Sequence, residues 1–126
     1  MIQSKYINDL LDLLLDGDDG ILARNQLPFL TENGFEYTGS GVFIRFSNES
    51  DINSHNVDSE NLVLNGVLIE TKEYPIEADA TLFFTDGKID YLEIWCHFGD
   101  YPEKDLTQYT LTQIWEDSPG KKIFRE

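Results

Sequence analysis

Basic residues are scarce in this chain. Nine Lys and Arg stand against 24 Asp and Glu, which gives a formal net charge of −15. Proteins that bind nucleic acids or anionic membranes use Lys and Arg to neutralise phosphate groups. The composition therefore argues against both kinds of partner and favours a basic one.

Cysteine and long apolar runs are also missing. Cys96 is the single cysteine, which excludes an internal disulfide and a zinc site built from several thiolates. No apolar run approaches the roughly 18 residues of a membrane span. Residues 1–20 are acidic, whereas a secretory signal begins with basic residues. We therefore expect a cytoplasmic protein.

The chain is nevertheless rich enough in apolar residues to fold. Of its 126 residues, 40% are hydrophobic and 13% are aromatic. This length is typical of one domain, and acidic residues occur throughout instead of gathering in a tail. We expect a single globular domain that spans residues 1–126.

Residues 3–15 carry the clearest helical pattern. Apolar residues recur at the i, i+3, i+4, i+7 spacing of one helix face. The pattern predicts a helix that begins at Gln3 or Ser4 and stops at Gly17 in the left-handed conformation. The apolar face comprises Ile7, Leu10, Leu11 and Leu14, and the polar side comprises Asn8, Asp9, Asp12 and Asp16. We expect Leu10, Leu11 and Leu14 to be buried against Leu92 and Ile94 of the sheet.

Alternation of apolar and polar residues dominates after Gly34. It predicts strands at residues 35–38, 42–46, 67–74, 78–85, 88–97 and 109–115, and 122–125 shows the same alternation more briefly. A short helical turn is expected at 21–26, and the polar residues 47–61 predict the longest surface loop. The fold class is therefore α+β, with the N-terminal helix packed on a mostly antiparallel sheet of five to six strands.

The hairpin of residues 78–85 and 88–97, joined at Asp86-Gly87, has two alternative registers. A two-residue turn places Thr85 opposite Lys88, whereas a bulged three-residue turn places Phe84 opposite Lys88. We favour the bulged register because it alone separates polar from apolar faces. Its core face carries Ala78, Ala80, Leu82, Leu92, Ile94 and Cys96, and its second face carries Asp79, Thr81, Phe83, Ile89, Tyr91, Glu93, Trp95 and His97.

The second face of this hairpin is the candidate binding site. Tyr91 and Trp95 flank Glu93, and Asp79 lies opposite in the favoured register. Aromatic rings mixed with carboxylates suit a protein interface or a cationic partner. Two alternatives stay open. The aromatics pack under the C-terminal strand or the long loop as a second core, or the interface is the long loop, with acids Glu49, Asp51, Asp58 and Glu60.

No motif requires an enzyme. Cys96 and His97 are adjacent on a strand and so point to opposite faces, and the chain has no phosphate-binding loop or nucleophile elbow. The acidic residues 16–20 do not match the ligand spacing of a calcium loop. We expect no catalytic residues, no cofactor and no metal. The alternatives are an adaptor module, or a small-molecule carrier or enzyme whose pocket between helix and sheet is lined by Phe35, Phe43 and Phe83.

Residues 64–67 (L-N-G-V) and the hairpin pattern A-x-L-F-F-x-D-G-x-I-D-x-L-E-I resemble small bacterial immunity proteins. These proteins neutralise toxins delivered between competing cells, for example by contact-dependent growth-inhibition systems. The resemblance implies a non-catalytic protein that binds and inhibits a cognate, basic toxin domain. It assigns no contact residues, because toxin-contacting residues vary within such families.

Overall fold

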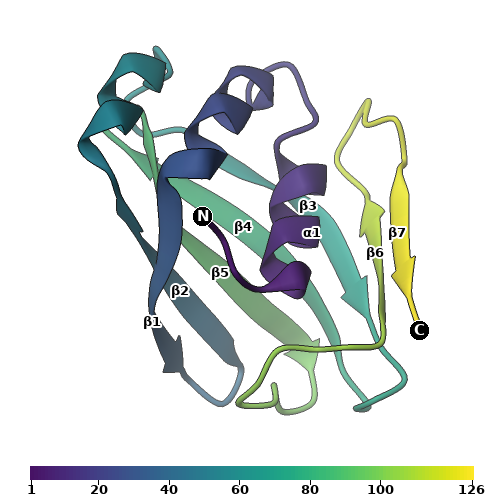
Figure 1. Ribbon diagram of the computed structural model, residues 1–126. Coiled ribbons are helices and arrows are strands. Elements are labelled where there is room, and N and C mark those ends of the chain that lie inside the picture. Colours follow the sequence, from purple (N-terminus) through teal and green to yellow (C-terminus); the bar gives the residue numbers. More distant parts are fainter.

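The computed structural model describes residues 1–126 and has the α+β class that the sequence predicts (Figure 1). It contains one α-helix, α1 (Lys5–Leu14), and two 3₁₀ segments, η1 (Ile21–Phe29) and η2 (Ser50–His55). None of these helices has the length and hydropathy that crossing a membrane requires. The strands are β1 (Leu30–Tyr37), β2 (Gly41–Asn48), β3 (Val63–Glu70), β4 (Glu77–Thr85), β5 (Lys88–Phe98), β6 (Tyr109–Gln113) and β7 (Lys122–Arg125).

The strands form one antiparallel sheet in the order β1-β2-β5-β4-β3-β6-β7. Seven strands exceed the predicted five to six, because the four residues of β7 do pair with β6. Strand β3 also begins earlier than predicted. Asn65-Gly66 forms a bulge inside the strand, and Gly66 has φ 98°. A side chain at this glycine would collide with Trp115, so the bulge requires glycine for two reasons.

Helix α1 begins as predicted and ends differently. Ser4 is its N-cap and accepts a hydrogen bond from the Ile7 amide through Oγ. Gly17 is not left-handed, so the predicted glycine stop is wrong. The helix instead ends with a 3₁₀-type hydrogen bond, in which the Asp16 amide donates to the Leu13 carbonyl at 3.3 Å.

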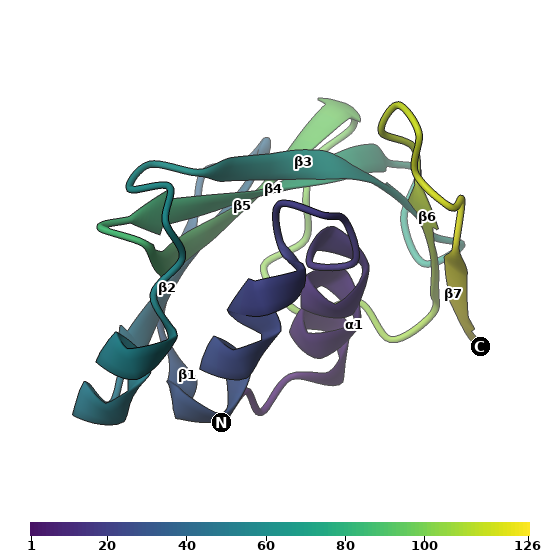
Figure 2. The same ribbon diagram turned by 90° about the horizontal axis from the view of Figure 1, so that it is seen from above.

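All helical segments lie on one side of the sheet, which curves around α1 (Figure 2). Leu10, Leu11 and Leu14 are buried, as the helical pattern predicts. The helix lies nearest β3, β6 and β4, so its expected contacts with Leu92 and Ile94 on β5 are displaced by about one strand. Together with η1 and the concave face of the sheet, it encloses a core of 29 buried side chains.

Gln26 ties η1 to the turn between β4 and β5. Its side chain is fully buried, and its Nε2 donates to the carbonyls of His55 and Gly87 at 3.0 and 2.9 Å. Its Oε1 accepts from the Ile89 amide at 2.8 Å. One amide group thus satisfies three backbone groups from three segments, which fixes the turn against the helical layer.

Asp9 lies in the core, although the helical pattern places it on the polar side. It is 8% exposed, and its carboxylate accepts hydrogen bonds from the Tyr109 hydroxyl (2.7 Å) and from Arg125 Nε (3.0 Å). Desolvation raises the pKa of Asp9, but the hydrogen bonds from Arg125 and Tyr109 outweigh it and the pKa is lowered overall. The ion pair between Asp9 and Arg125 connects α1 to the edge strand β7.

The loop predicted at residues 47–61 is only partly a loop. Strand β2 extends to Asn48, and η2 follows at once. Ile52 from η2 is fully buried in the common core, next to η1. Ile52, together with the partly buried Val57, therefore anchors a segment whose composition is otherwise that of a surface turn.

We predict that Leu10→Ala lowers the free energy of unfolding by about 2–5 kcal/mol, because it leaves a cavity between α1 and the sheet. Urea unfolding followed by circular dichroism measures this change. Leu22→Ala is the matched control, since Leu22 is 70% exposed and its truncation removes little buried area. Equal effects of the two substitutions would contradict the assigned core face.

We predict that Asp9→Asn destabilises the protein at pH 7 and that this difference shrinks as the pH falls. A carboxylate with a lowered folded pKa contributes stability above its unfolded pKa of about 3.9, and this stability is lost as the pH drops through the folded value. Urea midpoints of both proteins between pH 7 and pH 2.5 check the trend. A gap that widens toward low pH would contradict it.

Candidate protein-binding face

The turn of the central hairpin follows neither of the two predicted registers alone. Asp86 and Gly87 have φ 53° and 78°, which is a two-residue type I′ turn, and Thr85 lies opposite Lys88. A bulge then follows Ile89, so that Leu82 lies opposite Leu92. The bulge restores the predicted separation of faces, with one exception. Ile89 is fully buried instead of lying on the second face.

The second face of the hairpin continues across the sheet as one uncovered surface, which we call the open face. Alternation along each strand points these side chains away from α1. Five of the nine exposed large hydrophobic residues of the chain belong to it: Val63, Trp95, Phe98, Ile114 and Phe124. The open face also carries Phe43, Arg45, Asp79, Thr81, Phe83, Tyr91, Glu93 and His97.

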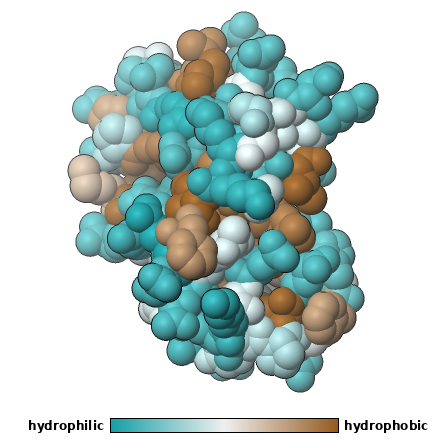
Figure 3. All heavy atoms as spheres, turned by 90° about the vertical axis from the view of Figure 1, so that its right-hand side faces the viewer, coloured by the Kyte–Doolittle hydropathy of each residue, from teal (hydrophilic) through white to brown (hydrophobic).

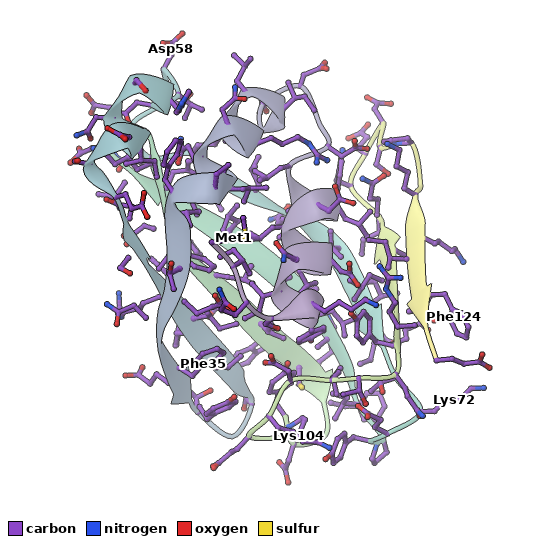
Figure 4. All side chains as sticks on the ribbon, viewed as in Figure 1. Met1, Phe35, Asp58, Lys72, Lys104 and Phe124 are labelled. Carbon is purple, nitrogen blue, oxygen red and sulfur yellow. The ribbon has the colours of Figure 1, made fainter.

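The alternative in which these aromatics form a second core is wrong. Strand β7 lies at the far edge of the sheet beyond β6, and the segment with η2 lies on the helical side (Figures 1 and 2). Phe124 projects outward from β7, at the opposite edge from Phe35 on β1 (Figure 4). Seen from the β7 side, apolar groups are scattered within a largely hydrophilic surface (Figure 3).

Three rings pack together on the open face. Phe83 stacks on Tyr91 with ring centroids 4.5 Å apart, and Phe43 meets Tyr91 at 6.1 Å in a tilted arrangement. The Arg45 guanidinium lies 5.6 Å from the centroid of Tyr91. Tyr91 is therefore half-buried by its own neighbours, and its ring already has a cation from the same chain.

Trp95 differs from Tyr91 because its side chain is 50% exposed. Asp79 lies directly opposite Trp95 on β4, whereas the favoured register placed it opposite Glu93. Thr81 lies opposite Glu93 instead. His97 Nε2 contacts Asp79 Oδ2 at 3.0 Å. The structure thus brings Asp79, Glu93 and Trp95 together on adjacent strands.

The second set of candidate residues lies elsewhere. Glu49, Asp51, Asp58 and Glu60 are all exposed around η2, and Asp58 projects beyond the end of the sheet (Figure 4). The nearby rings of Phe29 and His55 stack on each other at 5.5 Å and are only partly exposed. This loop offers charge with little apolar area, whereas the open face offers both.

Sequence reasoning missed several residues of the open face. Phe98 is 60% exposed because a second bulge turns the end of β5 outward. On the sequence alone, Phe43 is expected only in the alternative pocket and Arg45 has no expected role, although alternation along β2 places both on this face. The pairing of β2 with β5 was the missing information.

The expected pocket between helix and sheet is not formed by Phe35, Phe43 and Phe83. Phe43 and Phe83 lie on the open face, and Phe35 pairs with buried Ile44 on the other side. The largest hollow, about 630 Å³, is on the surface between Leu14–Gly20, Val63–Asn65 and Trp115–Pro119. No group of three or more His, Cys, Asp or Glu side chains is placed to hold a metal ion.

No protein-family model, curated protein or solved structure matches the chain. What the geometry offers is an uncovered sheet surface with exposed aromatic rings and carboxylates, and surfaces of this composition bind other proteins.

We predict that the Cys96 thiol reacts slowly in the native protein. Cys96 is 5% exposed on the core face, and burial together with the charge of Asp100 raises its pKa. Its reaction with an aromatic disulfide reagent at pH 8 is expected to be at least about tenfold slower than in the urea-unfolded chain. A native rate equal to the unfolded one would mean that Cys96 is an accessible nucleophile.

Proposed function

We propose that this chain is a toxin-neutralising protein of the immunity type, which acts in the cytoplasm by binding a cognate basic toxin domain. The observation that carries the proposal is the open face, where Trp95 and Phe98 are exposed beside Asp79 and Glu93. Large aromatic residues at the centre of an interface supply most of the binding energy. No catalytic step by this chain is part of the proposal.

Charge complementarity selects the partner. A net charge of −15 makes association with another acidic protein or a second copy unfavourable, whereas it attracts a basic domain over long range. Many toxins that act on nucleic acids are basic, because they must bind phosphate groups themselves. The hairpin that resembles immunity proteins, β4–β5, is also the centre of the open face.

The alternative is a small-molecule-binding protein or enzyme. The buried core fills the space between α1 and the sheet, so a small-molecule ligand would have to bind in the surface hollow beside Trp115. A ligand that co-purifies in that hollow would favour it. An adaptor role in a larger assembly would use the open face without inhibiting any toxin.

Co-expression tests the proposal directly. We expect the gene immediately upstream to encode a large secreted protein with a basic C-terminal domain, and that domain is the probe. We expect cells that produce this domain to survive only when the present chain is co-expressed, and we expect the two proteins to co-purify. Cell death despite a folded, abundant chain would contradict the proposal.

We predict that charge and aromatic substitutions on the open face affect different rate constants. Asp79→Lys and Glu93→Lys should slow association with the toxin domain, because these charges steer the encounter. Trp95→Ala should cost about 2 kcal/mol, expressed mainly as faster dissociation. Association should also slow markedly with salt, since the Debye length falls to about 3 Å at 1 M.

The loop acids supply the matched control. Asp51→Lys changes the net charge by the same amount as Asp79→Lys, at an exposed site on the helical side. Surface plasmon resonance should therefore show a smaller loss of association rate for Asp51→Lys. The reverse order would move the interface to Glu49, Asp51, Asp58 and Glu60.

A further inference from the structure

The pairing of β2 with β5 places a residue of β2 opposite each outward residue of β5. Arg45 lies opposite Tyr91, Phe43 opposite Glu93, and Gly41 opposite Trp95. At the first of these pairs the guanidinium of Arg45 lies over the ring of Tyr91. The same ladder thus presents two aromatic rings, four residues apart, of which one already has a cation.

At Trp95 the residue opposite on β2 is Gly41, which has no side chain. A Cβ atom at Gly41 would collide with the carbonyl oxygen of Ile94, so the close approach of the two strands requires glycine there. Gly41 therefore contributes no side chain beside the indole, although its own backbone is buried. The indole ring is 50% exposed, whereas Tyr91 is half-buried.

Carboxylates surround this indole on its other sides. Asp79 lies opposite Trp95 on β4, and Glu93 lies two residues before it on the same face of β5. His97 contacts Oδ2 of Asp79, and no Lys or Arg of the chain forms an ion pair with Asp79 or Glu93. An exposed ring beside two such carboxylates is the arrangement that binds a guanidinium group.

We propose that an arginine side chain of the partner lies on the exposed indole of Trp95, with its guanidinium directed to Asp79 and Glu93. This rests on the proposed function and names the group that the open face recognises. The intermolecular pair repeats the Arg45–Tyr91 contact that the chain makes by itself. Arginine suits the position better than lysine, because its planar group stacks on a ring while it binds carboxylates.

The chain has two tryptophans, which makes a direct test feasible. Trp115 borders the acidic hollow with Asp18, Asp19, Glu116 and Asp117, so nonspecific attraction of a cation would act there. The indole N–H signals of Trp95 and Trp115 are distinguished in a nitrogen-15 spectrum by the variant Trp115→Phe. The probe is an octaarginine peptide, and the matched controls are octalysine and octacitrulline.

We expect octaarginine to shift the Trp95 signal saturably and more than the Trp115 signal. Octalysine should bind a few-fold more weakly, and octacitrulline, which has the shape without the charge, should leave Trp95 unmoved. The double substitution Asp79→Asn with Glu93→Gln should weaken the Trp95 response about fivefold or more. The control pair Asp18→Asn with Asp19→Asn should leave the Trp95 response within about twofold. This pair also removes two negative charges, but it removes them at the hollow beside Trp115.

Three results would overturn the inference: a shift of Trp115 without Trp95, an equal response to octacitrulline, or equal effects of the two double substitutions. Its failure is separable from that of the proposed function. If the chain neutralises the toxin but the Trp95 signal does not respond to octaarginine, only the arginine contact is disproved. If the Trp95 signal responds to octaarginine but the chain neutralises no toxin, only the immunity role is disproved.

Discussion

Burial of the helical layer against one face of the sheet is the constraint on which the other features depend. Seven strands present two faces, and α1, η1 and η2 all lie on the concave one. Strand alternation then obliges every second residue to face outward without cover. Leaving Trp95, Phe98 and Phe124 in water forgoes favourable burial, and a binding partner would recover it.

A buried amide group lies beside the point where the register of β4 and β5 shifts. The Gln26 side chain accepts a hydrogen bond from the Ile89 amide and donates one to the Gly87 carbonyl. These bonds hold the start of β5 against η1. The bulge that follows Ile89 shifts the register of β4 and β5 by one residue. Without that shift the strands would present a mixture of core and surface residues. The same register shift therefore determines which hairpin residues lie in the core and which lie on the open face.

The sequence was sufficient to predict the features that repeat. The helical spacing identified Leu10, Leu11 and Leu14 as buried, and the alternation identified Asp79, Glu93 and Trp95 as sharing a face. Features that depend on distant partners could not be predicted. Asp9 is buried because Arg125 and Tyr109 approach it from the end of the chain, and Tyr91 is covered because β2 brings Arg45 to it. Local patterns contain no information about either approach.

Hydroxyl-radical footprinting of the complex with the neighbouring toxin domain tests the central claim most directly. It measures the loss of side-chain exposure residue by residue, and the open face and the helical side both carry exposed reactive side chains. The account predicts that Trp95 and Phe98 lose most of their oxidation on binding, while Leu22 on the helical side keeps its free rate. Unchanged oxidation of Trp95 and Phe98, with protection of the segment around η2, would contradict it.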